Sequence, residues 1–104
     1  MTAHLRPVER ESDMFTIISY DIVDDRRRTN VMKYLKGWGT RVQYSVFECI
    51  LDARAFATVV RELQRMIDQN TDSVRCYRLD EAAVTRIQII GIGAVSKDPT
   101  HYLV

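Results

Sequence analysis

The apolar and polar positions of this chain follow two periods, which mark strands and helices. Residues 14–22 are almost continuously apolar, β-branched or aromatic and contain no Gly or Pro, so they predict a strand that is buried on both faces and central in a sheet. Residues 41–51 alternate between two sets of side chains, and on pattern alone they form one long strand. Residues 74–79 and 87–93 are short apolar segments that predict two further strands.

Helical spacing begins after the first strand. Val31, Leu35 and Trp38 recur at the period of a helix, and they predict a helix that covers one side of the sheet. Asp24 or Asp25 can cap its start, because a carboxylate accepts the free backbone N–H groups there. The glycines of the sequence KGWG are expected to end it.

A second helix is predicted after residue 52. Asp52 can serve as its N-cap, and the sequence DQNTDS interrupts the pattern at its far end. Its apolar stripe consists of Phe56, Val59, Val60, Leu63, Met66 and Ile67. This stripe is expected to pack in the core.

The order of these elements is strand, helix, strand, helix, strand, strand. A turn at Tyr44 and Ser45 would split the middle strand into a hairpin and give a ferredoxin-like βαββαβ sandwich of the α+β class. The residues do not demand this turn, because no Gly, Asn or Asp marks it. The strand at 87–93 would then be left over, and an apolar strand without a place in its own sheet suggests pairing with another chain.

Composition and length limit the classes of protein that need to be considered. The chain has 104 residues, which fits one domain, and 46% of them are hydrophobic. We expect residues 1–13 to form a flexible N-terminal extension, 14–96 the ferredoxin-like domain and 97–104 a C-terminal tail. No segment has the length of a membrane span or the apolar centre of a signal peptide, so a cytoplasmic protein without membrane contact is expected. The net charge of +1 means that nucleic-acid binding would depend on a local cluster of arginines.

Cysteine and histidine offer little for catalysis. Cys49 and Cys76 are far apart in the sequence, and two thiols make neither a disulfide framework nor a zinc site, so we interpret them as buried structural thiols. His4 and His101 lie near the two ends of the chain, which makes histidine-based catalysis an unfavourable hypothesis.

The segment YDIVDDRRRTNVMKYLKGWGTRVQYSVFECIL resembles the CRISPR-associated protein 2 family, the small subunit of the spacer-acquisition machinery. Three blocks carry the likeness in order: YDI followed by DD, a basic first turn leading to the helix that ends in WG, and RVQYSVFE. The resemblance spans roughly residues 14–92. It implies the hairpin at Tyr44 and Ser45, a symmetric homodimer, and addition of strand 87–93 to the sheet of the partner subunit.

The resemblance also implies a function. Members of this family are described as metal-dependent endonucleases acting on RNA or double-stranded DNA, and as the DNA-holding centre of a complex with the CRISPR-associated integrase protein. The second role does not require the first, so an enzyme and a non-catalytic scaffold stay open as alternatives. A ferredoxin-like regulatory domain that binds a small ligand is the weakest hypothesis, because the chain lacks a Gly-rich ligand loop.

Asp21 is the candidate catalytic residue and metal ligand. A carboxylate at the end of a strand is a hard oxygen ligand suited to Mg²⁺ or Mn²⁺. The simpler interpretation is an Asp that only ends a strand before a turn, and the resemblance favours the ligand. One carboxylate is too little to hold a metal ion well, whereas a two-fold axis would bring two copies of Asp21 together. For Asp24 and Asp25, helix capping is the favoured interpretation.

Arginines form the candidate nucleic-acid contacts. Arg26, Arg27 and Arg28 fall in the first helical turn, where cations are electrostatically disfavoured, and their clustering suggests a phosphate ligand. A solvated charged face is the ordinary interpretation of such a cluster, and the resemblance favours phosphate binding, for Arg28 more than for Arg26 and Arg27. The resemblance places Arg41 near the same face and Tyr20, Ser45 and Phe47 beside the site, with core packing as the alternative for Tyr20 and Phe47. Asn30 occupies a position that is often basic in the family, and Arg75, Arg78 and Arg86 can extend the basic surface.

Overall fold

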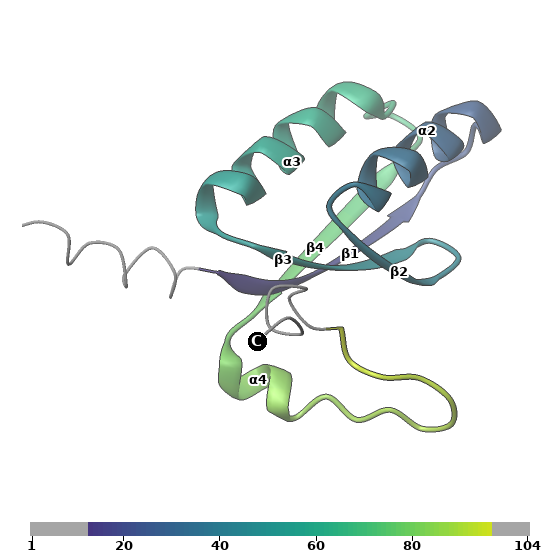
Figure 1. Cartoon of the computed structure of the whole chain (residues 1–104). Helices are drawn as coiled ribbons and strands as arrows, with labels where there is room; N and C mark the ends of the chain where they lie inside the picture. The colour runs from purple at the N-terminus through teal and green to yellow at the C-terminus, as the bar shows by residue number, and fades with distance from the viewer. Residues whose placement is uncertain (1–12, 97–104) are drawn as a thin grey trace, which may run out of the picture.

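The structure is a computed structural model that describes residues 13–96, and two long helices cover one face of its four-stranded antiparallel sheet (Figure 1). The elements in chain order are β1 (Met14–Asp21), α2 (Asp25–Lys36), β2 (Gly39–Gln43), β3 (Val46–Leu51), α3 (Ala53–Met66), β4 (Ser73–Leu79) and α4 (Glu81–Thr85). The strand order β2-β3-β1-β4 makes β1 an interior strand, as its sequence predicts. The ferredoxin-like sandwich is therefore confirmed, whereas the expectations for 1–12 and 97–104 lie outside the described residues.

The helix α2 begins and ends close to its predicted limits. Asp24 is the N-cap, and its carboxylate accepts a hydrogen bond of 2.8 Å from the backbone N–H of Arg27. Val31 and Leu35 are completely buried against the sheet, and Gly37 is the C-cap. Local capping and the period of the apolar residues are thus sufficient to define this helix.

The middle of the chain forms a hairpin, with β2 and β3 joined at Tyr44 and Ser45. The single long strand expected from the alternating pattern alone is wrong, and the turn implied by the family resemblance is confirmed. The backbone N–H of Tyr20 donates to the carbonyl of Ser45 at 3.1 Å, so the end of β1 holds the turn. The register between β2 and β3 shifts between Arg41 and Gln43, which is a bulge beside the turn.

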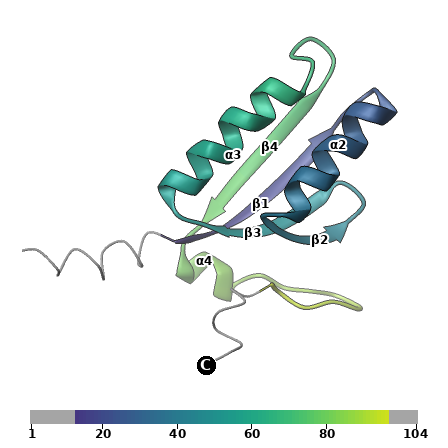
Figure 2. The ribbon, with the colours of Figure 1, turned by 45° about the horizontal axis from the view of Figure 1, so that its top comes forward.

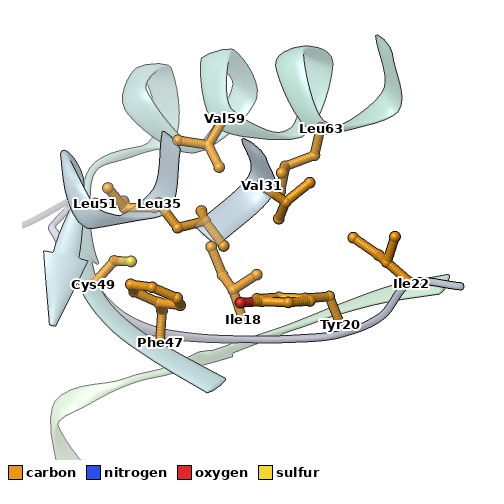
Figure 3. Close-up of a cluster of buried hydrophobic side chains, with 10 residues drawn as sticks. All are labelled: Ile18, Tyr20, Ile22, Val31, Leu35, Phe47, Cys49, Leu51, Val59 and Leu63. Carbon is orange, nitrogen blue, oxygen red and sulfur yellow. The ribbon is translucent and has the colours of Figure 1, made fainter. Parts of the chain in front are cut away.

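The core fills the space between the sheet and the two long helices (Figure 3). Asp52 caps α3 by accepting a 2.8 Å hydrogen bond from the N–H of Ala55, and Val59 and Leu63 point from this helix into the core. Phe56 and Met66, two other members of the predicted stripe, are only partly buried. None of the helices in residues 13–96 is long and apolar enough to cross a membrane.

Gly39 has a different role from the one its sequence suggests. It is the first residue of β2 rather than a helix terminator. A Cβ at this position would overlap the carbonyl oxygen of Glu48 and the Sγ of Cys49 on β3. Only Gly permits this close approach between the two strands, because any side chain would have to displace backbone.

The chain after β4 runs across the side of the sheet that α2 and α3 leave open (Figures 1 and 2). Asp80 caps the short helix α4, which the sequence interpretation missed although Asp followed by Glu and two Ala is a recognisable start signal. Residues 87–93, expected as a strand, have no strand neighbour within the described chain and form none. Ile90 and Ile92 in this segment are 92% and 103% exposed. A strand needs the hydrogen bonds of a neighbour, so its formation on a partner subunit stays a prediction.

Candidate nucleic-acid and metal site

Asp21 is the last residue of β1, and its side chain is exposed. Its neighbours Tyr20 and Ile22 are buried beneath the helices (Figure 3). Because successive side chains of a strand alternate between faces, Asp21 lies on the open face of the sheet. Its register partner on β4 is Ser73, and this pairing fixes the backbone that carries the carboxylate.

The three arginines at the start of α2 have three different surroundings. Arg26 is exposed. Arg27 donates through Nε and Nη2 to the carboxylate of Asp72, at 2.8 and 3.2 Å. Arg28 donates through Nη1 to the carbonyl of Ile22 at 2.7 Å and contacts the Asp25 carboxylate through Nη2. The cluster that the sequence presents as one unit is therefore divided by the fold.

Arg28 and Arg41 both line a shallow pocket of about 280 Å³. Arg41 donates through Nε and Nη2 to the carbonyl of Tyr44, at 3.0 and 2.7 Å, and its guanidinium lies 5.1 Å from the centre of the Tyr44 ring. The lining is completed by Tyr20, Asp25, Thr29, Met32 and Tyr44. Each guanidinium has five N–H donors and uses only some of them within the protein, so both can also bind an anion such as phosphate.

The residues predicted beside the site do not all reach it. Tyr20 reaches the pocket although its ring is buried, and burial raises the pKa of its hydroxyl. Phe47 is completely buried and stacks against Tyr20, with ring centres 6.4 Å apart. Phe47 therefore packs in the core, in agreement with the packing alternative. Ser45 contributes its backbone carbonyl, which holds the turn.

Asp72 is a site neighbour that the sequence interpretation missed. Its side chain has no exposed surface, and it accepts hydrogen bonds from Arg27, from the N–H groups of Val23 and Asp68, and from the hydroxyl of Thr71. The hydrogen bonds from Arg27 hold the pKa of the Asp72 carboxyl well below its usual range. In the sequence, Asp72 is one of several polar residues in a turn. Its role is visible only in the folded chain, where it contacts Arg27, a residue 45 positions away in the sequence.

Arg78 does not extend the basic surface. Its Nε donates to the hydroxyl of Thr16 at 3.3 Å, and its Nη2 contacts the carbonyl of Leu51. Its guanidinium lies 4.4 Å from the centre of the Phe56 ring on α3. Arg78 thus joins three strands and a helix at the end of the molecule away from Asp21, whereas Arg75 and Arg86 are exposed.

Cys49 is buried, as predicted, whereas Cys76 is only partly buried and packs against the core. Burial raises the pKa of Cys49 to about 11, and burial also raises the pKa of Cys76. A thiol with a raised pKa holds little thiolate at neutral pH and is a poor nucleophile or metal ligand. Both cysteines are free, so they are consistent with structural packing.

A metal ion would find few ligands on one protomer. Within residues 13–96 no group of three or more His, Cys, Asp or Glu side chains is placed to hold a metal ion. Asp21 offers one exposed carboxylate on the open face of the sheet. Mg²⁺ commonly keeps several waters and takes one or two carboxylates together with phosphate oxygens of a substrate. One Asp21 carboxylate is the minimum for such a site, and two copies from two protomers would hold the ion more firmly.

Comparison with known proteins assigns these features to a family. The family model described as CRISPR associated protein Cas2 matches residues 14–87. A curated relative from Chloroflexus aurantiacus, named CRISPR-associated endoribonuclease Cas2 3, is 64% identical over 91 residues, which are 88% of this chain and 98% of the relative. A relative from Thermus thermophilus, named CRISPR-associated endonuclease Cas2 2, is 38% identical over 76 residues, 73% of this chain and 80% of the relative.

Solved structures give the same fold. A hypothetical protein from Thermus thermophilus superposes with a TM-score of 0.71 at 35% identity, covering 79% of this chain and 95% of its own. Streptococcus pyogenes Cas2, solved at pH 6.5, superposes with a TM-score of 0.67 at 32% identity and covers 75% of this chain and 100% of its own.

Proposed function

Because this chain belongs to the CRISPR-associated protein Cas2 family, we propose that it acts in CRISPR adaptation as a metal-dependent endonuclease on RNA or double-stranded DNA. The observation that carries the proposal is Asp21, an exposed carboxylate that rigid strand pairing holds at the end of β1. The names of the curated relatives, endoribonuclease and endonuclease, support a nuclease activity.

The proposed active unit is a two-fold homodimer joined through the open faces of the two sheets. The open face carries Ile17 and the 47% exposed Tyr77, which are apolar or aromatic residues that the helices do not cover. Residues 87–93 would leave their coil conformation and add a strand to a free sheet edge of the partner, where β2 and β4 are the two edges available. This arrangement accounts for the exposed isoleucines of that segment.

In this dimer each Asp21 carboxylate would lie on the open face of its own sheet, and a two-fold axis passing close to Asp21 would bring the two carboxylates together. A Mg²⁺ or Mn²⁺ ion held between them would supply Lewis-acid chemistry to a phosphodiester. Arg28 and Arg41 would bind neighbouring phosphates of the same strand, because their guanidinium groups flank the pocket at the edge of the helical layer. Asp21 would then act on the reacting phosphate, and the arginines would orient the backbone around it.

The test is a cleavage assay on single-stranded RNA and duplex DNA with the parent and Asp21→Asn, each with Mg²⁺, with Mn²⁺ and with EDTA. Asp80→Asn is a matched control, since it removes a carboxylate at the α4 cap, and Asn is an equally good cap. We expect the parent and the control to cleave in the presence of Mg²⁺ or Mn²⁺. We expect no cleavage by Asp21→Asn, and none by any variant in EDTA. Full cleavage by Asp21→Asn, or by the parent in EDTA, would refute the metal mechanism.

The second candidate function is a scaffold that binds duplex DNA and the CRISPR-associated integrase protein without cutting. The pocket between Arg28 and Arg41 favours it, because guanidinium groups bind phosphate without a metal ion. If the protein is a scaffold, the parent should not cleave with any metal ion. Asp21→Asn should then retain duplex binding and spacer acquisition. Cleavage that depends on Asp21 would exclude a purely passive scaffold.

A further inference from the structure

The segment that follows Asp21 is held in place by Arg28 and by Asp72, which is paired with Arg27. It consists of residues 22–24 and connects β1 to α2. Arg28 Nη1 donates to the carbonyl of Ile22 at 2.7 Å, and the N–H of Val23 donates to Asp72 Oδ1 at 3.0 Å. Arg27 in turn donates two hydrogen bonds to the same Asp72 carboxylate. The backbone immediately after Asp21 is therefore fixed on both its carbonyl and its N–H side.

The Asp72 carboxylate is shielded from water, which sets it apart from a surface ion pair. Its side-chain exposure is 0%, and that of Arg27 is 30%. Arg65 and Glu62 on α3 form the same type of pair with 72% and 34% exposure. A shielded carboxylate whose hydrogen-bond partners are all present fixes the relative positions of those partners. Exposed ion pairs, in contrast, contribute little to stability.

Asp72 is the residue immediately before β4, and this position places it beside Asp21. The next residue, Ser73, is the register partner of Asp21 on β4. Asp72 also accepts the N–H of Asp68 at 2.9 Å, which fixes the loop between α3 and β4. One carboxylate thus connects three parts of the chain at the end of the sheet where Asp21 lies.

We infer that Asp72 and Arg27 form a positioning pair that holds the Asp21 carboxylate and the start of α2 in their working arrangement, and that Arg27 is not a phosphate contact. This inference rests on the proposed function for its effect on cleavage. Its structural part, the order of the β1–α2 connection, is independent of any activity. It assigns to Arg27 a role different from the nucleic-acid contact that its place in the sequence suggests.

The experiment compares Asp72→Asn and Arg27→Gln with the matched controls Glu62→Gln and Arg65→Gln in the full chain. Asp72→Asn keeps the size of the side chain and one acceptor oxygen, and Arg27→Gln removes the charge pair without touching Asp72, so at least one variant is expected to fold. Amide hydrogen exchange by NMR should accelerate at Val23 in both variants and stay unchanged in both controls. Unchanged exchange at Val23 in the two variants would overturn the inference.

Cleavage and binding provide the second readout, at temperatures well below the unfolding transition of each variant. We expect kcat to fall by about 10-fold to 100-fold with KM for the nucleic acid unchanged, as for residues that support a metal ligand. The double variant should be no worse than Asp72→Asn alone, because the two residues act as a unit. A lower salt slope of duplex binding in Arg27→Gln would show a lost phosphate contact and would overturn the assignment of Arg27.

The two arms separate failure of this inference from failure of the proposed function. If the parent cuts no substrate in any metal, the nuclease proposal fails, and faster exchange at Val23 in the variants still supports the positioning pair. If the parent cuts and both variants cut at the parental rate, the positioning role is overturned while the nuclease proposal stands.

Discussion

Arg41 and Tyr44 are joined across the β2–β3 turn by two hydrogen bonds from the guanidinium to the Tyr44 carbonyl and by a cation–π contact of 5.1 Å. Tight hairpins usually depend on Gly, Asn or Asp, and this turn has none of them. A side chain therefore supplies the stabilisation that local turn residues usually provide. Arg41 has two functions in this interpretation, one in the fold and one in the proposed binding of phosphate.

We expect Arg41→Gln to lower the free energy of unfolding by about 1 kcal/mol, because the hydrogen bonds to the turn are lost. The same variant should weaken duplex binding. Urea denaturation measures the first effect and a binding titration the second. Arg54→Gln, an exposed arginine on α3, is the control for loss of one positive charge. A variant with parental stability would show that the turn does not depend on Arg41.

Gly39→Ala should destabilise the protein by about 2 kcal/mol, in the range of overpacked sites. The added methyl group would meet the backbone of Glu48 and the Sγ of Cys49, which cannot both move away. Gly37→Ala is the control, because its Cβ would lie at an ordinary 3.4 Å from the Tyr34 carbonyl and its φ of −76° suits any residue. Thermal unfolding of the two variants should separate them. Equal stability would contradict the close approach at Gly39.

Asp25→Asn should raise affinity for duplex DNA, because the Asp25 carboxylate occupies part of the Arg28 guanidinium inside the pocket. Arg28→Ala should lower affinity and reduce the salt slope by about 1, as expected for one lost phosphate contact. Glu81→Gln removes the same charge on α4 and controls for net charge. Titrations at several salt concentrations measure all three. If Glu81→Gln gains as much affinity as Asp25→Asn, the gain comes only from the change in net charge.

Ile90→Glu should convert the proposed dimer into a monomer. Ile90 is 92% exposed in the single chain, and a charge there would be buried without a partner if residues 87–93 add to another sheet. Gln88→Glu introduces the same charge into the segment without removing apolar surface, and it should affect the dimer less. Light scattering at micromolar concentration gives the masses. A parent that is monomeric under these conditions would rule out the dimer.

The Asp72 carboxyl makes stability depend on pH in acid. Its folded pKa lies below its usual range, because the hydrogen bonds from Arg27 favour the charged form. The stabilisation is fully present above the pKa of an unfolded Asp, about 3.9, and is lost as the pH falls below it toward the folded value. The melting-temperature difference between the parent and Asp72→Asn should therefore be constant near neutral pH and shrink below about pH 4. A constant difference down to the acid transition would contradict the shift.

Elements with local signals can be recognised from the amino-acid sequence alone. The apolar run of β1, the N-caps Asp24 and Asp52 and the apolar stripe of α3 each lie within a few residues of the structure they specify. Hydrogen bonds of a helix cap span three residues, and the faces of a helix or strand repeat every few positions, so these features can be recognised without a fold. The order of the elements gives the ferredoxin-like topology only together with the turn at Tyr44 and Ser45, which the family resemblance implied and the residue pattern did not mark.

Contacts between side chains that are distant in the sequence became visible only in the folded chain. Arg26, Arg27 and Arg28 are adjacent and chemically identical in the sequence, yet Arg27 is paired with Asp72, 45 residues away. Asp21 lies on the opposite face of the sheet from Tyr20, so the predicted metal ligand and the arginine pocket do not share a lining. Arg78 is directed inward by contacts with Thr16 and Leu51. The physical reason is that the partner of a charged side chain depends on strand register and loop closure, which bring together residues with no local relationship in the sequence.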